Sequence, residues 1–378
     1  MPWRLARAMA AAAPPLETIS LPIGEAGGAV LAGPLHARAD LPAFDAAAMD
    51  GYAVAGPGPW TVTGRVMAGP AAPGEVGPGQ AVEIGTGAPV PRGTETVVPY
   101  ESTTRAGTWI RGPFEPGRHV RRRGEDCQKG AKVLPSGTAV TPVVQGLAAS
   151  LGLDALRVRR RPRVTVLVTG DELATSGLPG AGRVRDALGP LLPGLIAWGG
   201  GVTGPPSRVA DRGSLLAAAI AAAGEADVVV VCGSSSKGAA DHLREVLREA
   251  GAELLVESVA CRPGHPQLLA RLADGRLVVG LPGNPYAALV AALTLLVPAL
   301  GAMTGRAGGH GEWAKLDARV TAHPADTRIV AVRRAGARMV PVGHDRPGLL
   351  QGAALADALA VVPPRWRGEE VELLGLPF

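Results

Sequence analysis

The stretch from Asp227 to Asp241 constrains the fold more than any other part of the chain. It opens with four consecutive valines, Val228–Val231, which Cys232 and Gly233 follow, and a helical pattern begins near Asp241. An uninterrupted β-branched run is typical of a parallel strand buried on both faces. A turn of small residues between such a strand and a helix often binds anions, because free backbone N–H groups and the helix dipole point there. We therefore expect an α/β domain with an anion site at this turn.

The side chains of the same turn add further hydrogen-bond donors. Ser234, Ser235 and Ser236 carry hydroxyls, and Lys237 adds a positive charge. Asp241 would either cap the following helix or face a metal ion. We predict that the rest of the chain supports this loop.

Length and composition limit the class of protein. A chain of 378 residues exceeds one typical core, so we expect two to four domains. Aromatic residues make up only 3%, which argues against nucleic-acid binding by base stacking. The net charge of +5 permits an anionic partner without requiring one.

Other features indicate a cytoplasmic protein without a membrane partner. The three cysteines, Cys127, Cys232 and Cys261, lie far apart and form no CxxC motif, which favours a reducing compartment. The first 15 residues resemble a soluble helix more than a signal peptide, because an arginine interrupts their short apolar part. No stretch holds 18 uninterrupted apolar residues, so we expect no membrane span.

The region from residue 163 to 305 alternates strand and helix patterns. This alternation predicts a doubly wound parallel sheet, with ligands outside the carboxyl ends of its strands. Four polar or glycine-rich loops follow the predicted strands, and we expect them to converge on one edge. They are TGDE (169–172), CGSSSKG (232–238), CRPGHP (261–266) and LPGNP (281–285).

The remaining regions predict two smaller β-rich units. Residues 55–120 are rich in Gly and Pro, show short β patterns and lack a helical period. The segment after Gly305 also shows short strands, which predict a small C-terminal β-domain.

Two basic clusters allow alternative interpretations. Arg121–Arg123 precede Glu125 and Asp126, which suits a surface ion-pair cluster or a site for a phosphate and a cation. The arginines of residues 157–163 suit solvated charge or a polyanion site.

The chain lacks the common catalytic motifs: it has no Walker A loop, no G-x-G-x-x-G after a predicted strand, no HExxH and no G-x-S-x-G. What the strand ends offer is chemistry for a phosphorylated ligand. Carboxylates beside such loops suit Mg²⁺ bridging to phosphate oxygens, and an arginine, histidine and serine pocket suits a small tetrahedral anion. The residues concerned are Asp171, Glu172, Asp186, Asp211, Asp241, Lys237, Arg262 and His265.

Six segments in order resemble the MoeA/gephyrin-E family, the molybdopterin molybdenumtransferases. The combination is highly specific and spans nearly the whole chain. The segments are LPAFDAAAMDGYAV (41–54), TGAPVPRGTETVV (86–98), RRRGEDCQKGAKVLPSGT (121–138), ASLGLDALRVRRRPRVTVLVTGDEL (149–173), GRVRDALGP (182–190) and GLPGNPYAAL (280–289).

The resemblance implies a domain organisation that agrees with the residue patterns. Residues 1–40 with 136–162 would form a discontinuous linker domain, and 41–135 an inserted β-rich domain. Residues 163–305 would form a MogA-like, doubly wound α/β domain that binds molybdopterin, and 306–378 the C-terminal β-domain. The family usually forms an elongated homodimer.

The resemblance also implies an activity. Adenylylated molybdopterin and molybdate would be the substrates, the pyrophosphate bond would be cleaved with Mg²⁺, and molybdenum cofactor and AMP would be released. Matching motifs assign catalytic roles to Asp50, Asp126, Glu172 and Asp241, with Glu172 and Asp241 also as metal ligands. We also expect substrate-binding roles for Thr86, Asp186, Asp211, Gly233, Ser234, Ser236, Lys237, Arg262, His265, Gly283 and Asn284.

The sequence departs from the family pattern at the predicted ligand edge. The usual SGGVSxG loop is CGSSSKG here, and the usual KPGKP is RPGHP, with Arg262 and His265 in place of lysines. A further lysine is Ser258, and the usual RDSN or RDTN is RDAL, with Ala187 and Leu188. Besides the enzyme, the sequence therefore allows a non-catalytic paralogue that binds molybdopterin or a partner protein. A third possibility is a related phosphate-ester enzyme on the same fold.

Overall fold

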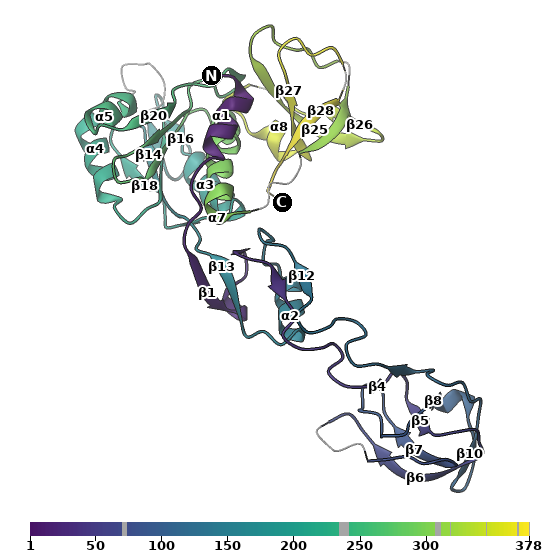
Figure 1. The fold of residues 1–378 in the computed structure, drawn as a ribbon. Helices are drawn as coiled ribbons and strands as arrows, with labels where there is room; N and C mark the ends of the chain where they lie inside the picture. The colour runs from purple at the N-terminus through teal and green to yellow at the C-terminus, as the bar shows by residue number, and fades with distance from the viewer. Residues whose placement is uncertain are drawn as a thin grey trace.

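The computed structural model describes residues 1–69, 74–233, 242–306, 311–317, 319–344, 346–368 and 370–377. The molecule is elongated (Figure 1). A broad head holds the α/β domain and the C-terminal β-domain, a narrow middle part follows, and a β-rich module lies at the far end.

The head is built on a mixed sheet of seven strands, ordered β17-β14-β19-β23-β22-β20 with β18 also on β14. The half on the β14 side is parallel, and β22 runs antiparallel to both of its neighbours. The strands are β14 (Arg163–Thr169), β17 (Val202–Thr203), β18 (Ser207–Val209), β19 (Val228–Cys232), β20 (Glu253–Val256), β22 (Leu268–Arg271) and β23 (Leu277–Leu281).

The four valines of β19 explain why this strand lies at the centre. Val228 and Val230 pack into the core on one face of the sheet, and Val229 and Val231 pack into the core on the other. Successive side chains of a strand point to opposite faces, so only an uninterrupted apolar run fills both cores. The predicted doubly wound architecture is confirmed in this half of the sheet.

The strand β22 was not predicted, although a local signal was present. It forms a hairpin with β23 through Asp274 and Gly275, and Gly275 has a φ of 90°. An Asp-Gly pair between two apolar runs is a strong hairpin signal, because the turn needs positive φ. The sheet therefore carries an antiparallel pair at one edge.

Helices cover both faces of this sheet. α3 (Leu188–Trp198) contributes to one core, and α4 (Gly213–Ala222) and α5 (Leu243–Glu249) pack in the other. A long helix follows β23, made of α6 (Pro285–Ala291), a π-helical turn (Ala292–Leu296) and α7 (Val297–Thr304). By length and composition this helix could cross a membrane, but 78% of its apolar window is buried inside the molecule, as in a core helix.

The first helix, α1 (Trp3–Ala10), packs on the head, although the sequence grouped residues 1–40 with the linker. Trp3 is 2% exposed, and its indole N–H donates to Oγ1 of Thr294 at 3.0 Å. Ala6 and Ala10 follow Trp3 on the same helical face and are fully buried. Through this face, α1 packs against the long helix.

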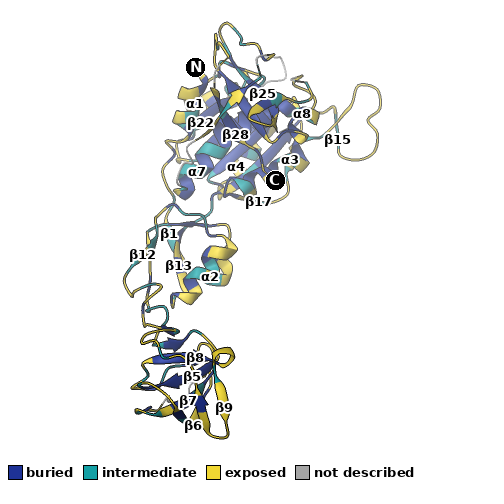
Figure 2. Cartoon of the chain, turned by 90° about the vertical axis from the view of Figure 1, so that its right-hand side faces the viewer, coloured by how far each residue is buried: buried dark blue, intermediate teal, exposed yellow. Residues whose placement is uncertain are grey.

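The narrow middle part is a three-stranded sheet covered by one helix (Figure 2). β13 (Ala155–Arg159) lies between β1 (Thr18–Pro22) and β2 (Val30–Leu31). A second pair joins β3 (Leu35–His36) and β12 (Lys132–Leu134). α2 (Pro142–Ser150) begins after Thr141, whose Oγ1 accepts from the backbone N–H of Val144, and has proline at its first position.

The module at the far end is a six-stranded sheet ordered β8-β5-β7-β6-β10-β9. Its central strands are buried (Figure 2). β4 (Ala46–Ala47) pairs with β11 (Val120–Arg121) where the chain enters and leaves the module. The other strands are β5 (Gly51–Val54), β6 (Trp60–Val66), β7 (Gln80–Ile84), β8 (Thr96–Pro99), β9 (Thr104–Ala106) and β10 (Trp109–Arg111).

The C-terminal β-domain closes on itself. Its strands follow the order β25-β26-β24-β28-β27, and β27 also pairs with β25, which completes a barrel. β21 (Cys261–Arg262) adds to β25 from outside, so part of the CRPGHP loop belongs to this sheet. The barrel strands are β24 (Glu312–Leu316), β25 (Thr327–Ala335), β26 (Arg338–Pro341), β27 (Ala358–Val362) and β28 (Glu370–Gly375), and α8 (Gln351–Ala354) lies beside β25.

Candidate active site

Residues of three of the four predicted strand-end loops, those that begin at Thr169, Cys232 and Leu281, meet around a cavity of about 620 Å³ at the carboxyl edge of the parallel strands, whereas the CRPGHP loop does not line it. Strand ends of β14, β19 and β23 line it, together with the start of α3. Six of the predicted site residues line this one cavity: Glu172, Asp186, Asp211, Gly233, Gly283 and Asn284.

Two of the loops are joined through their acidic residues. The backbone N–H of Asp171 donates to Oδ2 of Asp211 at 3.0 Å, and the N–H of Asp211 donates to Oδ1 of Asp171 at 3.4 Å. Glu172 follows Asp171 and is exposed. These two reciprocal hydrogen bonds hold the loops together, and the side chain of Glu172 remains exposed at the cavity.

Asp186 stabilises the start of α3. Its Oδ1 accepts the backbone N–H groups of Leu188 at 3.0 Å and Gly189 at 2.9 Å. A carboxylate in this position satisfies donors that have no partner inside the helix. Any contact of Asp186 with the ligand, as predicted, therefore has to be compatible with its hydrogen bonds to the start of α3.

Glycine is required at position 233, where β19 ends. Gly233 has a φ of 100°, and a Cβ there would lie 2.7 Å from the carbonyl oxygen of Thr169. The Cα of Gly233 also lies close to Gly283, since a Cβ on Gly283 would be only 3.6 Å from it. Two loop backbones thus approach each other at the cavity without side chains between them.

The neighbouring thiol is not a candidate nucleophile. Cys232 is 1% exposed, and burial raises the pKa of its thiol well above the ordinary value. A thiol with a raised pKa supplies little thiolate near neutral pH. Its role is packing in the core.

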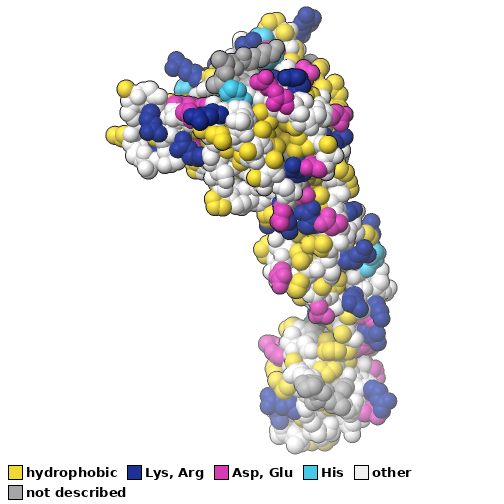
Figure 3. All heavy atoms as spheres, turned by 90° about the vertical axis from the view of Figure 1, so that its left-hand side faces the viewer, with side chains coloured by type: hydrophobic (Ala, Val, Ile, Leu, Met, Phe, Trp, Pro, Cys, Tyr) yellow, Lys and Arg dark blue, Asp and Glu magenta, His cyan; other side chains and the backbone are white. Residues whose placement is uncertain are grey.

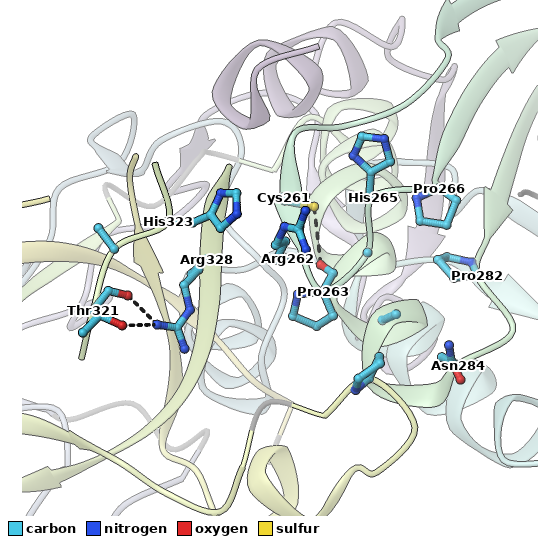
Figure 4. Close-up of a pocket in the computed structure, with 14 residues that line it drawn as sticks. Cys261, Arg262, Pro263, His265, Pro266, Pro282, Asn284, Thr321, His323 and Arg328 are labelled. Carbon is cyan, nitrogen blue, oxygen red and sulfur yellow. Dashed lines mark hydrogen bonds between the residues drawn. The ribbon is translucent and has the colours of Figure 1, made fainter. Parts of the chain in front are cut away.

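A second cavity, of about 690 Å³, adjoins the first at Asn284, which lines both. Arg262 and His265 come from the CRPGHP loop, and His323 and Arg328 come from the C-terminal β-domain (Figure 4). Arg262 and Arg328 face each other in the pairing of β21 with β25. This cavity is rich in positive charge, whereas three carboxylates and one arginine, Arg185, line the first.

Sequence reasoning missed the C-terminal residues that line the second cavity, His323 and Arg328, and Asp326 beside them. His323, Asp326 and Arg328 lie about 60 residues beyond Arg262 in a different domain, and no motif marked them. The unusual pairing of β21 with the barrel brings them together.

Asp326 is closely tied to this cationic group. Its Oδ2 accepts from Nε of Arg262 at 2.6 Å and lies 3.5 Å from Nδ1 of His323. The hydrogen bond from Arg262 lowers the pKa of the Asp326 carboxyl below its ordinary value. Asp326 therefore stays ionised beside Arg262.

Three other predicted residues lie in the far module. Oδ1 of Asp50 accepts from the backbone N–H of Thr86 at 2.6 Å and from its hydroxyl at 3.0 Å. Asp126 forms an ion pair with Arg121. The narrow middle part separates this module from the head, so one chain does not bring these residues to the cavities (Figure 1).

The first basic cluster forms ion pairs at the base of the module. Arg122 pairs with Asp45 at 2.7 Å, and Arg123 pairs with Asp40 at 2.6 Å. Asp40 also accepts the backbone N–H of Lys129. These contacts are those of the ion-pair interpretation.

The second basic cluster is also occupied within the protein. Arg160 pairs with Asp227 and Glu17, while Arg161 donates to the carbonyls of Gly200 and Gly201. On the face shown in Figure 3, the basic side chains are scattered and several lie beside acidic ones. The contacts favour a structural role over a polyanion site.

Four predicted residues, Ser234, Ser236, Lys237 and Asp241, lie outside the described residues. Within the described ranges, no group of three or more His, Cys, Asp or Glu side chains is arranged to hold a metal ion. A magnesium site of one or two carboxylates completed by substrate phosphates needs no such group.

Fold and site together define a multidomain α/β protein with two adjoining, oppositely charged cavities at one sheet edge. Comparisons with known proteins agree over the whole length. Residues 1–152 match the MoeA N-terminal region (domain I and II), and residues 165–302 match a probable molybdopterin binding domain.

Relatives and solved structures extend this match. A Mycobacterium tuberculosis protein named molybdopterin molybdenumtransferase 2 is 37% identical over 301 residues, which cover 75% of this chain and 74% of that protein. A molybdopterin molybdenumtransferase of Staphylococcus epidermidis is 28% identical and spans 93% of this chain and 89% of its own. The crystal structure of a molybdopterin biosynthesis MoeA protein from Pyrococcus horikoshii OT3 covers both chains completely, with a TM-score of 0.82 and 25% identity. The chain belongs to the MoeA family.

Proposed function

We propose that this protein is a molybdopterin molybdenumtransferase that inserts molybdate into adenylylated molybdopterin and releases AMP, in the biosynthesis of molybdenum cofactor. The observation that carries the proposal is the junction of two oppositely charged cavities at Asn284. A reaction between a nucleotide-bearing pterin and a tetrahedral oxyanion needs neighbouring sites for both. The names of the relatives support the same chemistry.

The phosphates of the pterin nucleotide would bind near the glycine-rich strand ends. Gly233 and Gly283 leave the backbone accessible, and Asn284 directly precedes α6. Backbone donors at such a strand-to-helix turn bind phosphate oxygens. Ser234, Ser236 and Lys237, which follow Gly233, would add donors.

Molybdate would bind in the cationic cavity. Arg262 and His265 line it from the α/β domain, and Arg328 lines it from the barrel. Arginine recognises planar pairs of oxygens through two N–H groups, which suits an oxyanion. Of these residues, Arg262 and His265 take the place of lysines that are usual in the family.

Magnesium would bind at the carboxylate-lined cavity. Glu172 and Asp211 are the described donors there, and Asp241 would be a third. The ion would neutralise the phosphate oxygens of the bond that is cleaved. Removal of magnesium with EDTA should abolish AMP release, and added Mg²⁺ should restore it.

We also propose a homodimer, because one chain leaves the predicted catalytic residues apart. Asp50 and Thr86 adjoin strands β5 and β7 of the far module, Asp126 follows β11 at its base, and Glu172 lines a cavity of the head. A twofold dimer could bring the module of one chain to the head of the other, since both faces of such an interface are equivalent. All three cysteines are free, which supports a cytoplasmic location.

The test is AMP release from adenylylated molybdopterin by the purified protein with Mg²⁺, with and without molybdate. Molybdate-stimulated release supports the enzyme. Tight binding of the nucleotide without release would instead indicate the non-catalytic paralogue, which the departures at Ala187, Leu188 and His265 favour. If the protein neither binds the nucleotide nor releases AMP, both the enzyme and the molybdopterin-binding paralogue are contradicted.

A further inference from the structure

Arg262 is held in an unusual way for an exposed side chain. Its side chain is 65% exposed, yet its Nε donates at 2.6 Å to Asp326, whose side chain is only 16% exposed. The carboxylate of Asp326 is mostly buried, and it restrains the long, exposed side chain of Arg262 at the edge of the cationic cavity. Among the described residues, neither Nη group of Arg262 donates a hydrogen bond.

The backbone that carries Asp326 is itself fixed. Nδ1 of His323 accepts the N–H groups of Asp326 at 2.9 Å and Ala325 at 3.3 Å. The next residue, Thr327, opposes Cys261 in the pairing of β21 with β25. The anchor is therefore built on a turn and a strand, which restrict where its carboxylate can lie.

We propose that Asp326 is a positioning residue for oxyanion binding: it holds Arg262 by Nε and leaves both Nη groups for a tetrahedral oxyanion. This inference rests on the proposed function, which puts the oxyanion in this cavity. A fixed guanidinium loses less side-chain entropy when it binds a ligand than a free one. Arginine has five N–H donors, so use of one by Asp326 leaves four.

Asp326 also affects anion binding in the opposite direction to its positioning of Arg262, and the two effects have to be distinguished. Its negative charge opposes the binding of an anion, so a purely electrostatic role would make it a competitor. Asparagine keeps an oxygen acceptor for Nε and removes the charge, alanine removes both, and glutamate keeps the charge but moves it. The three substitutions therefore give different results for positioning and for competition.

The experiment measures molybdate binding to the full-length protein by isothermal titration calorimetry, without turnover. We expect Asp326→Ala and Asp326→Glu to weaken binding by roughly three- to ten-fold, as expected when one long side chain must be immobilised. Asp326→Asn should bind at least as tightly as the native protein. In an Arg262→Ala background, Asp326→Ala should not weaken binding further.

A matched control is present in the same domain. Asp317 accepts from Nε of Arg319 at 2.9 Å, with 22% and 75% of the two side chains exposed, and neither residue lines the cavity. Asp317→Ala should leave molybdate affinity unchanged. Circular dichroism would establish that each variant is folded, and Asp326→Asn with Asp326→Glu keep the test open if the alanine variant does not fold.

The outcomes separate the inference from the function on which it rests. If the native protein binds molybdate and Asp326→Ala binds it equally or more tightly, the positioning role is wrong and the function stands. If the native protein binds AMP but not molybdate in the cavity, as shown by loss of AMP binding in Arg262→Ala, the oxyanion is a nucleotide phosphate and the molybdate assignment fails. If Arg262→Ala alters the binding of neither ligand, the positioning role and the placement of an oxyanion in this cavity are both wrong.

Discussion

Asp50 accepts two hydrogen bonds from Thr86 through one oxygen, from the backbone N–H at 2.6 Å and from the hydroxyl at 3.0 Å. These bonds, the backbone one first, lower the pKa of the Asp50 carboxyl below its ordinary value. Asp50 directly precedes β5 and Thr86 follows β7, and both strands belong to the module at the far end of the molecule (Figure 1). A charged and oriented carboxylate is thus held far from the cavities of its own chain.

A mixing experiment tests whether Asp50 acts in the site of a second chain. Asp50→Ala and Glu172→Ala should each abolish AMP release when assayed alone. Random mixing of the two variants should restore about a quarter of the native activity, because one of the two sites in each mixed twofold dimer is intact. As a control, refolded mixtures of Glu172→Ala with Asp211→Ala, both from the same cavity, should stay inactive. Equal inactivity of both mixtures would contradict a shared site.

The capping role of Asp186 predicts a difference between two substitutions. Asp186→Ala should lower the free energy of unfolding by about 1 kcal/mol, because the start of α3 loses its acceptor. Asp186→Asn should keep that stability, since asparagine caps helices as well as aspartate does. Turnover should fall in both variants, because each removes the negative charge at the cavity. Full turnover in the folded asparagine variant would limit Asp186 to its structural role.

The ion pair of Arg160 and Asp227 connects the middle part to the head. Arg160 donates to both oxygens of Asp227, at 2.8 and 2.9 Å, and the two side chains are 24% and 17% exposed. We expect Asp227→Asn to lower the free energy of unfolding by about 2–4 kcal/mol, because it leaves Arg160 without its main partner. Chemical denaturation at pH 7 measures this loss. Glu17→Gln is the control, because Glu17 also pairs with Arg160 but is 59% exposed, and should have little effect.

The same pair has a defined pH dependence. Burial alone would raise the pKa of Asp227, but hydrogen bonds from Arg160 and from the backbone of Arg163 lower it below its ordinary value of 3.8. A lowered folded-state pKa means that the stabilisation is present above the unfolded pKa and is lost as the pH falls through the folded one. The difference in the free energy of unfolding between the native protein and Asp227→Asn should therefore have its full, constant value from about pH 5 to 7. It should shrink as the pH falls below the ordinary pKa. A difference that grows on acidification would contradict this assignment.

The buried indole of Trp3 predicts how firmly the first helix is attached. Trp3→Phe removes the hydrogen bond to Thr294 and part of the packed ring, so the free energy of unfolding should fall by about 1–3 kcal/mol. Thr294 keeps its bond to the carbonyl of Val290, so it is not left unpaired. Leu5→Ala is the control, because Leu5 is on the same helix and 50% exposed. Thermal unfolding and limited proteolysis near residue 15 should distinguish the two.

Local patterns in the sequence predicted the centre of the fold well. The valine run of β19 is stable only inside a sheet that helices cover on both faces. The loops that follow the parallel strands meet at the carboxyl edge of this sheet, as its topology dictates. Residues linked by one strand-end geometry, such as Glu172, Gly233 and Asn284, could therefore be placed together from sequence.

Long-range pairings could not be predicted in the same way. β21 has only two residues, Cys261 and Arg262, and its partner strand comes from another domain. No periodicity marks so short a strand, so His323, Asp326 and Arg328 were missed. Trp3 was also grouped with the linker, because the partner that buries it is about 290 residues away.

The entry and exit of the far module lie side by side. Ala46 and Ala47 of β4 pair with Arg121 and Val120 of β11, and Leu41 bridges to Cys127 just below them. An insertion whose two ends are neighbours can be exchanged or lost without changing the path of the host chain. The module can therefore diverge independently of the head, so evolution or protein engineering can graft a different module at this junction while the sheet and its cavities stay intact.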